Sequence, residues 1–193
     1  IWLDLSNTNI SDAALGKLAQ YFPNLWTLYL DNTKITDAGI EAMDCTTEDG
    51  LSNITNLSLQ NCTGITNASV SNFPAGVKDL NLLGCTGISN DGLSEIPTYC
   101  PSLQTLNLSN NGSITKEGVS DLASLEELQN LILEGCEQIN AEELVAADLF
   151  NWGVLQFGEG VNFGQDEDYE DDWEDEEEEY EEGAYDQTEE NEE

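Results

Sequence analysis

The sequence predicts an α/β solenoid of about six strand-turn-helix repeats, a horseshoe with a parallel sheet on its concave face, followed by a disordered acidic tail. Two observations lead to this prediction. A short apolar motif, Leu-x-Leu, recurs six times at intervals of about 25 residues. Residues 166–193 contain 19 acidic side chains in 28 positions and no basic one. Stacking of similar units explains the first observation, and self-repulsion with little apolar surface explains the second.

Each Leu-x-Leu motif predicts the core of a short strand. Because successive side chains of a strand point to opposite faces, both leucines face inward and the residue between them faces outward. One unit of this kind cannot close a core, whereas stacked units bury a continuous one. The six copies are Leu3-Asp4-Leu5, Leu28-Tyr29-Leu30, Leu57-Ser58-Leu59, Leu80-Asn81-Leu82, Leu106-Asn107-Leu108 and Leu131-Ile132-Leu133.

A helix is predicted after each strand. A Ser, Thr or Asn stands eight or nine residues after the first leucine, and an apolar residue follows four positions later. We expect the polar side chain to cap the helix by accepting from its first free N–H groups. The apolar residue begins the inward stripe of the helix. The expected caps are Ser11, Thr36, Thr66, Ser89, Thr115 and Asn140.

The turn after each strand holds a small side chain five residues beyond the first leucine. Three copies have cysteine there, Cys62, Cys85 and Cys136, and the others have Thr8, Thr33 and Asn111. Such a side chain can bond to the loop backbone while it stays buried. We therefore expect a structural ladder of reduced thiols, which fits an intracellular protein, cytoplasmic or nuclear.

Three regions are predicted from composition. Residues 1–145 hold the repeats, 146–164 form a C-terminal cap rich in aromatic residues, and 165–193 form the acidic tail. Ile1 falls inside a repeat, so we expect the N-terminal start of a longer protein to be missing. No apolar run approaches the length of about 20 residues that spans a bilayer.

The charge of the chain limits its partners. The net charge is −36, with four basic residues, all lysine, and no His. Without Arg, direct binding of nucleic acid or anionic membranes is disfavoured. A basic protein such as a histone becomes the favoured partner, and we expect the protein itself to be a monomer. Without His, a His-based catalytic pair is impossible, and no metal, cofactor or nucleotide motif is recognisable. We predict a protein that is not an enzyme.

The outward strand residues are the candidate binding site, because the concave face is the usual recognition surface of solenoids. Four aromatic residues spaced along the tail are candidate anchors on a basic protein: Tyr169, Trp173, Tyr180 and Tyr185. The candidate concave-face residues are Trp2, Asp4, Thr27, Tyr29, Asp31, Asn56, Ser58, Gln60, Asp79, Asn81, Leu83, Thr105, Asn107, Asn130, Ile132 and Glu134.

The segment 80–106 carries a family resemblance. Its Leu-Asn-Leu-Leu-Gly-Cys-Thr-Gly-Ile-Ser-Asn-Asp-Gly-Leu stretch and the later Cys-Pro-Ser-Leu-Gln-Thr-Leu resemble the cysteine-containing leucine-rich repeats. That subfamily is known from F-box/LRR proteins, the substrate receptors of ubiquitin ligases. The first two repeats, with Thr in the cysteine slot, look more like simpler leucine-rich repeats. The acidic tail makes the architecture similar to that of acidic leucine-rich nuclear phosphoproteins, which bind histones.

Three functional interpretations follow. The first is a non-catalytic scaffold that binds a basic protein through its concave face and its tail. The second, implied by the resemblance, is the substrate-recognition fragment of an F-box/LRR-type ubiquitin ligase. The third is an extracellular or salt-adapted repeat protein whose charge serves solubility.

Overall fold

The computed structural model describes residues 1–45, 51–140, 144 and 154–156. The chain divides into two units, Ile1–Phe163 and Gly164–Glu193, and the described residues all lie in the first. The predicted tail with its four aromatic anchors, and most of the predicted cap, lie outside the described residues. No helix in the described part of the chain is long and apolar enough to cross a membrane.

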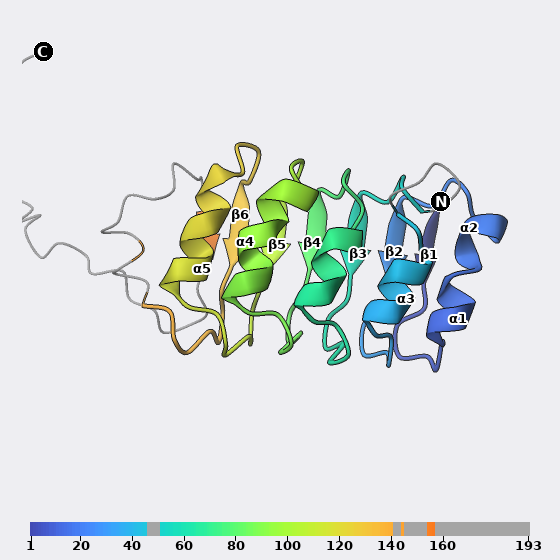
Figure 1. Cartoon of the computed structure of the whole chain (residues 1–193), viewed down its shortest axis with the longest axis horizontal. Coiled ribbons are helices and arrows are strands. Elements are labelled where there is room, and N and C mark those ends of the chain that lie inside the picture. Colours follow the sequence, from blue (N-terminus) through green and yellow to red (C-terminus); the bar gives the residue numbers. More distant parts are fainter. Residues whose placement is uncertain (46–50, 141–143, 145–153, 157–193) are drawn as a thin grey trace, which may run out of the picture. The chain divides into compact units, whose positions relative to one another are not determined.

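A single parallel sheet forms one layer of the repeat unit, and its strands follow one another in sequence order (Figure 1). The first leucines of successive Leu-x-Leu motifs are direct partners, as in Leu80 opposite Leu106. A seventh strand extends the six that were predicted and lies within the segment expected to be a cap. The strands are β1 (Trp2–Asp4), β2 (Thr27–Tyr29), β3 (Asn56–Ser58), β4 (Asp79–Asn81), β5 (Thr105–Asn107), β6 (Asn130–Ile132) and β7 (Val154–Gln156).

Helices form a second layer on one side of the sheet, where Figure 1 shows them in a row. The first repeat has two short helices in place of one, and the third has a 3-10 helix, whose Asn, Ser and Val residues are poor helix formers. The elements are α1 (Asp12–Leu15), α2 (Leu18–Tyr21), α3 (Asp37–Ala42), η1 (Asn67–Asn72), α4 (Asn90–Tyr99), α5 (Lys116–Asp121) and η2 (Leu122–Ser124).

The core lies between the two layers and consists of the inward leucines and the helix stripe. The first leucine of the motif in β2 through β6 is at most 1% exposed, which confirms the predicted strand register. In β1, Leu3 is only partly buried. Stacked repeats therefore share one core, as the period-2 pattern of the strands requires.

From the third repeat to the sixth, the cysteine slot links each repeat to the one before it. The thiols of Cys62, Cys85 and Cys136 donate to the carbonyl of the second leucine in the preceding repeat, at 3.0–3.1 Å. Asn111 fills the same slot, and its amide donates to Leu82 O at 2.9 Å. These side chains are buried, so each one satisfies a backbone carbonyl that water does not reach.

A second ladder joins the helix starts, and it corrects the expected role of the caps. Thr36, Ser89 and Thr115 occupy the N-cap position, but their side chains accept no backbone N–H of their own helix. Each instead bonds to the first helical residue of the previous repeat. Thr36, for example, donates its N–H and hydroxyl to the Asp12 carboxylate at 3.0 and 2.7 Å. Ser11 and Thr66 do cap their own helices, accepting from the N–H groups of Ala14 and Ala68. The segment after the sixth expected cap, Asn140, lies largely outside the described residues.

The four steps of this helix-start ladder have the same geometry. The acceptor is Asp12, Asp37, Asn67 or Asn90, and the next N-cap residue supplies its backbone N–H at 2.8–3.0 Å. A glycine stands three residues after three of the N-caps, as Gly39, Gly92 and Gly118, where a Cβ would strike the ladder. At Gly39, for example, a Cβ would lie 2.8 Å from Ile35 Cγ2 and collide with the ladder carboxylate. In the step from Thr66 to Asp37, Ser69 holds this position and donates its hydroxyl to the Asp37 carboxylate.

Candidate functional site

The candidate site is the sheet face opposite the helices, which we call the concave face. Side chains at the first and third positions of each strand point out of the sheet, because those at the second position enter the core. Outward residues of successive strands lie side by side, so Thr27, Asn56, Asp79, Thr105 and Asn130 form one row and Asp4, Tyr29, Ser58, Asn81, Asn107 and Ile132 form another.

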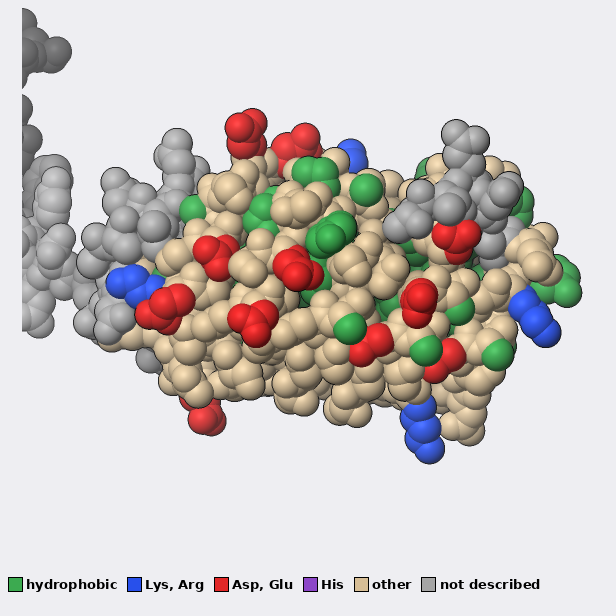
Figure 2. Space-filling view, viewed as in Figure 1, with side chains coloured by type: hydrophobic (Ala, Val, Ile, Leu, Met, Phe, Trp, Pro, Cys, Tyr) green, Lys and Arg blue, Asp and Glu red, His purple; other side chains and the backbone are tan. Residues whose placement is uncertain are grey.

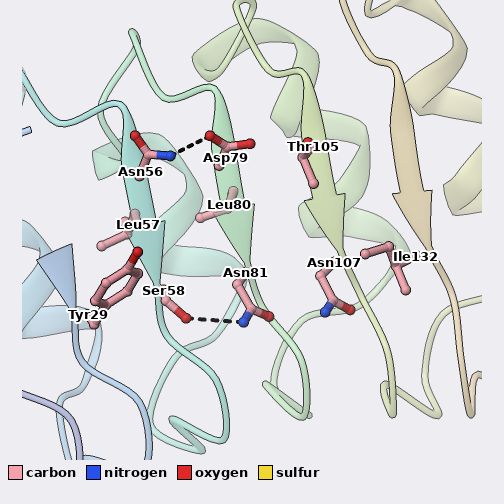
Figure 3. Close-up of a pocket in the computed structure, with 10 residues that line it drawn as sticks. All are labelled: Tyr29, Asn56, Leu57, Ser58, Asp79, Leu80, Asn81, Thr105, Asn107 and Ile132. Atoms are coloured by element: carbon pink, nitrogen blue, oxygen red, sulfur yellow. Dashed lines mark hydrogen bonds between the residues drawn. The ribbon is translucent and has the colours of Figure 1, made fainter. Parts of the chain in front are cut away.

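A groove of about 250 Å³ runs across the middle of this face, from Tyr29 on β2 to Ile132 on β6 (Figure 3). Most of the side chains that line it are polar, and two pairs of them are bonded to each other. The amide of Asn56 donates to the Asp79 carboxylate, and the amide of Asn81 donates to Ser58 Oγ at 3.1 Å. These bonds hold the side chains in fixed orientations, which favours recognition of an extended ligand without ordering of the site on binding.

Ser58 differs from the prediction, because it is only 6% exposed. Its hydroxyl donates to Asp31 Oδ1 at 2.5 Å and also receives the amide of Asn81. The larger neighbours therefore cover it. Ser58 supports the groove from below and presents little surface of its own.

The turns after the strands carry acceptors that stabilise their own backbone. The side chains of Asp4, Asn81 and Asn107 each accept from the N–H two residues later, at 2.9–3.1 Å. This is the Asx-turn pattern. Hydrogen bonds from Ser6 hold the pKa of the exposed Asp4 carboxyl below its usual value, so Asp4 is ionised at neutral pH.

The remaining candidates lie along the rim of the turns. Asp31 accepts from Gln60 N at 3.0 Å in addition to the Ser58 hydroxyl, and it is partly buried. Gln60 and Leu83 are also partly buried, whereas Glu134, in the sixth repeat, is exposed. Glu134 is therefore the exposed carboxylate among these turn residues, and Asp4, on β1 at the other end of the described repeats, is a second exposed carboxylate.

Three aromatic side chains gather at the β1–β2 end of the face, and we call Trp2, Trp26 and Tyr29 the aromatic cluster. They line a hollow of about 610 Å³ together with Thr27, Thr55 and Asn56. Trp2 is 65% exposed, Trp26 60% and Tyr29 39%. Trp26 is a site residue that the strand alternation missed, because it precedes β2. The available signal was its contrast with the polar residues aligned to it in later repeats.

Negative charge alone does not distinguish the concave face from the helix face of the molecule. In Figure 2, which looks onto the helices, acidic side chains are scattered over the other face too, and lysines lie at its margins. The residues that line the central groove include an acid, Asp79, and no base. A cationic ligand would meet no like charge there.

The described residues offer little for catalysis. Within them, no group of three His, Cys, Asp or Glu residues is arranged to hold a metal ion. All five cysteines are free and buried. Burial raises the pKa of Cys45, Cys85 and Cys100 to about 12, so these thiols are protonated and unreactive near neutral pH.

Comparison with known proteins identifies the repeat. A family model described as Leucine Rich repeat matches residues 99–123, which include β5 and α5. A chain from the crystal structure of the yeast Rad7 and Elc1 complex is 20% identical, with a TM-score of 0.59, over 79% of this chain and 42% of that one. Internalin C2 from Listeria monocytogenes is 20% identical over 80% of both chains, with a TM-score of 0.39. Curated proteins give no match.

The chain thus has a leucine-rich-repeat fold, as predicted from the Leu-x-Leu motif. It spans less than half the length of the chain that it matches in the yeast complex.

Proposed function

We propose that this protein is a non-catalytic scaffold that binds an extended basic segment of another protein along its concave face. The observation that supports the proposal is the central groove, where polar side chains are held in place by bonds to each other, where Asp79 supplies a carboxylate and where no base lines the wall. The amides and hydroxyls of the groove can bond to peptide groups of a ligand. The Asp79 carboxylate attracts its basic side chains.

The acidic tail belongs to the same proposal. Its 19 acids would attract a basic partner such as a histone over long range, and Tyr169, Trp173, Tyr180 and Tyr185 would anchor it. We expect a monomeric protein of the cytoplasm or nucleus, where free thiols such as the five of this chain persist.

A substrate-receptor role, as in F-box/LRR proteins, is a second candidate. The support for it is the cysteine-to-carbonyl ladder, which runs through the later repeats where the subfamily resemblance is strongest. Both candidate functions use the concave face as the binding surface. They differ in the bound protein, which is a basic partner for the scaffold and a ubiquitination substrate for the receptor.

The groove is tested by reversing one charge in it. Asp79→Lys should weaken binding of the full chain to core histones by more than about tenfold at 0.15 M salt, because it places a base in the groove. Asp91→Lys is the matched control, since it changes net charge equally from an exposed position on α4. Titration calorimetry measures both. Equal losses in the two variants would reduce the binding to unspecific charge and overturn the groove assignment.

The tail is tested by removing residues 165–193. The truncated chain should keep its fold, as judged by circular dichroism, and lose well over tenfold in histone affinity under the same conditions. Equal binding by the full and truncated chains would refute the role of the tail and leave the groove proposal standing.

A further inference from the structure

The aromatic cluster is set apart from the rest of the concave face. At the position of Trp26, just before the strand, the later repeats have Thr55, Lys78, Gln104 and Gln129. In the first two repeats, by contrast, Trp2 and Trp26, two of the four tryptophans of the chain, line one hollow together with Tyr29. Trp26 and Tyr29 belong to the β2 repeat, which has a hydrogen-bonded strand on each side. Their exposure is therefore not caused by an uncovered edge of the sheet.

The backbone beneath the cluster is rigid. Trp26 N donates to Ile1 O at 3.0 Å, and Trp26 O accepts from both Thr55 N and Asn56 N, at 2.8 and 3.0 Å. The rings thus project from a fixed sheet, and their exposed faces do not pack on the core. Exposed aromatic surface of this kind, next to polar residues, marks an interaction site.

Carboxylates flank the cluster on the turn side. Asp4 is the direct strand partner of Tyr29, and it is exposed and ionised at neutral pH. Asp31 lies two residues beyond Tyr29, toward the same turns. No lysine lines the hollow, and Thr55 separates Trp26 from Lys78 in the pre-strand row. A ligand here meets aromatic faces and, at their edge, negative charge.

We propose that the aromatic cluster is a subsite for an arginine side chain of the basic segment, an inference that rests on the proposed function. A guanidinium group is planar and weakly hydrated, so it stacks on an aromatic face and still directs N–H groups at a carboxylate. The three rings form an open surface and not an enclosed cage. Such a surface suits a flat guanidinium group better than it suits an ammonium group. Asp4 supplies the carboxylate.

The subsite predicts a preference between two peptides of equal charge. The full chain should bind a Gly–Arg repeat peptide about three- to tenfold more tightly than a Gly–Lys peptide of the same length, measured by titration calorimetry. Trp26→Ala should abolish that preference, and Trp26→Phe should keep part of it. Tyr99→Ala, which removes a 38% exposed aromatic on α4, is the matched control and should leave the preference unchanged. Circular dichroism verifies that each variant is folded.

The outcomes separate this inference from the proposed function. Equal affinity for the two peptides, or an equal effect of Trp26→Ala and Tyr99→Ala, would overturn the arginine subsite while the groove proposal stands. Tighter binding of a Gly–trimethyllysine peptide than of the Gly–Arg peptide would also overturn it, in favour of an ammonium site. Asp79→Lys should weaken both the Arg and the Lys peptide alike. Failure of the unmodified chain to bind either peptide would contradict the proposed function itself, and the subsite with it.

Discussion

The substitution Leu106→Ala tests whether the inward leucines of stacked repeats form one shared core. Leu106 lies on β5 between Leu80 and Leu131, and it has no exposed surface. The substitution removes apolar contacts worth roughly 2–3 kcal/mol in transfer free energy. Neighbouring repeats hold the backbone in place, so the cavity collapses only in part, and we expect a total loss of about 2–5 kcal/mol in the free energy of unfolding.

Urea denaturation followed by circular dichroism measures this loss. With a slope of about 2 kcal/mol per molar urea, a loss of about 3 kcal/mol lowers the midpoint by about 1.5 M. Ile132→Ala is the control, since Ile132 lies on the next strand but faces out of the sheet and is only partly buried. Its loss should be about 1 kcal/mol. A cost below about 0.5 kcal/mol for Leu106→Ala, or equal costs for the two variants, would refute the assignment of faces.

Two further predictions concern the ladders. Burial raises the pKa of Asp37, but hydrogen bonds from Ser69 and Thr66 outweigh it and hold the pKa below its usual value. The ionised Asp37 therefore stabilises the fold at any pH above its pKa in the unfolded chain. This contribution is lost as the pH falls through its lower pKa in the folded chain. Asp37→Asn should therefore cost about 1 kcal/mol at pH 7 and progressively less below pH 4, measured by urea denaturation; a pH-independent difference would exclude the carboxylate as the cause. The thiols of Cys62, Cys85 and Cys136 should react with a thiol reagent only on unfolding, and rapid labelling of these three in the native chain would show that the cysteine slots are open.

The cap positions show where prediction from sequence stopped. Ser and Thr at these positions were correctly placed at helix starts, because the change from strand to helix periodicity is local. Their partners were not. Thr36 bonds to Asp12, 24 residues earlier, because stacking brings one helix start against the next. Nothing within a single repeat specifies that approach, so local capping was expected instead.

The concave face shows a similar division. Strand alternation placed Asp79 and Asn107 on it correctly, but it could not tell that Ser58 is covered by Asp31 and Asn81. Trp26 was missed for a related reason. It precedes the strand, where alternation no longer decides the direction of a side chain. It becomes part of a candidate site only because it lines the same hollow as Trp2.

By itself, the sequence determined the repeat, the strand register, the inward leucines and the absence of Arg and His. All of these are set by composition or by a period of two residues along one strand. Only the tertiary structure decided which residues bond between repeats, how deeply Ser58 is buried and that three aromatic side chains share one hollow. Those features depend on side chains that are more than 20 residues apart in the chain, and the parallel stacking of strands is what brings them into contact.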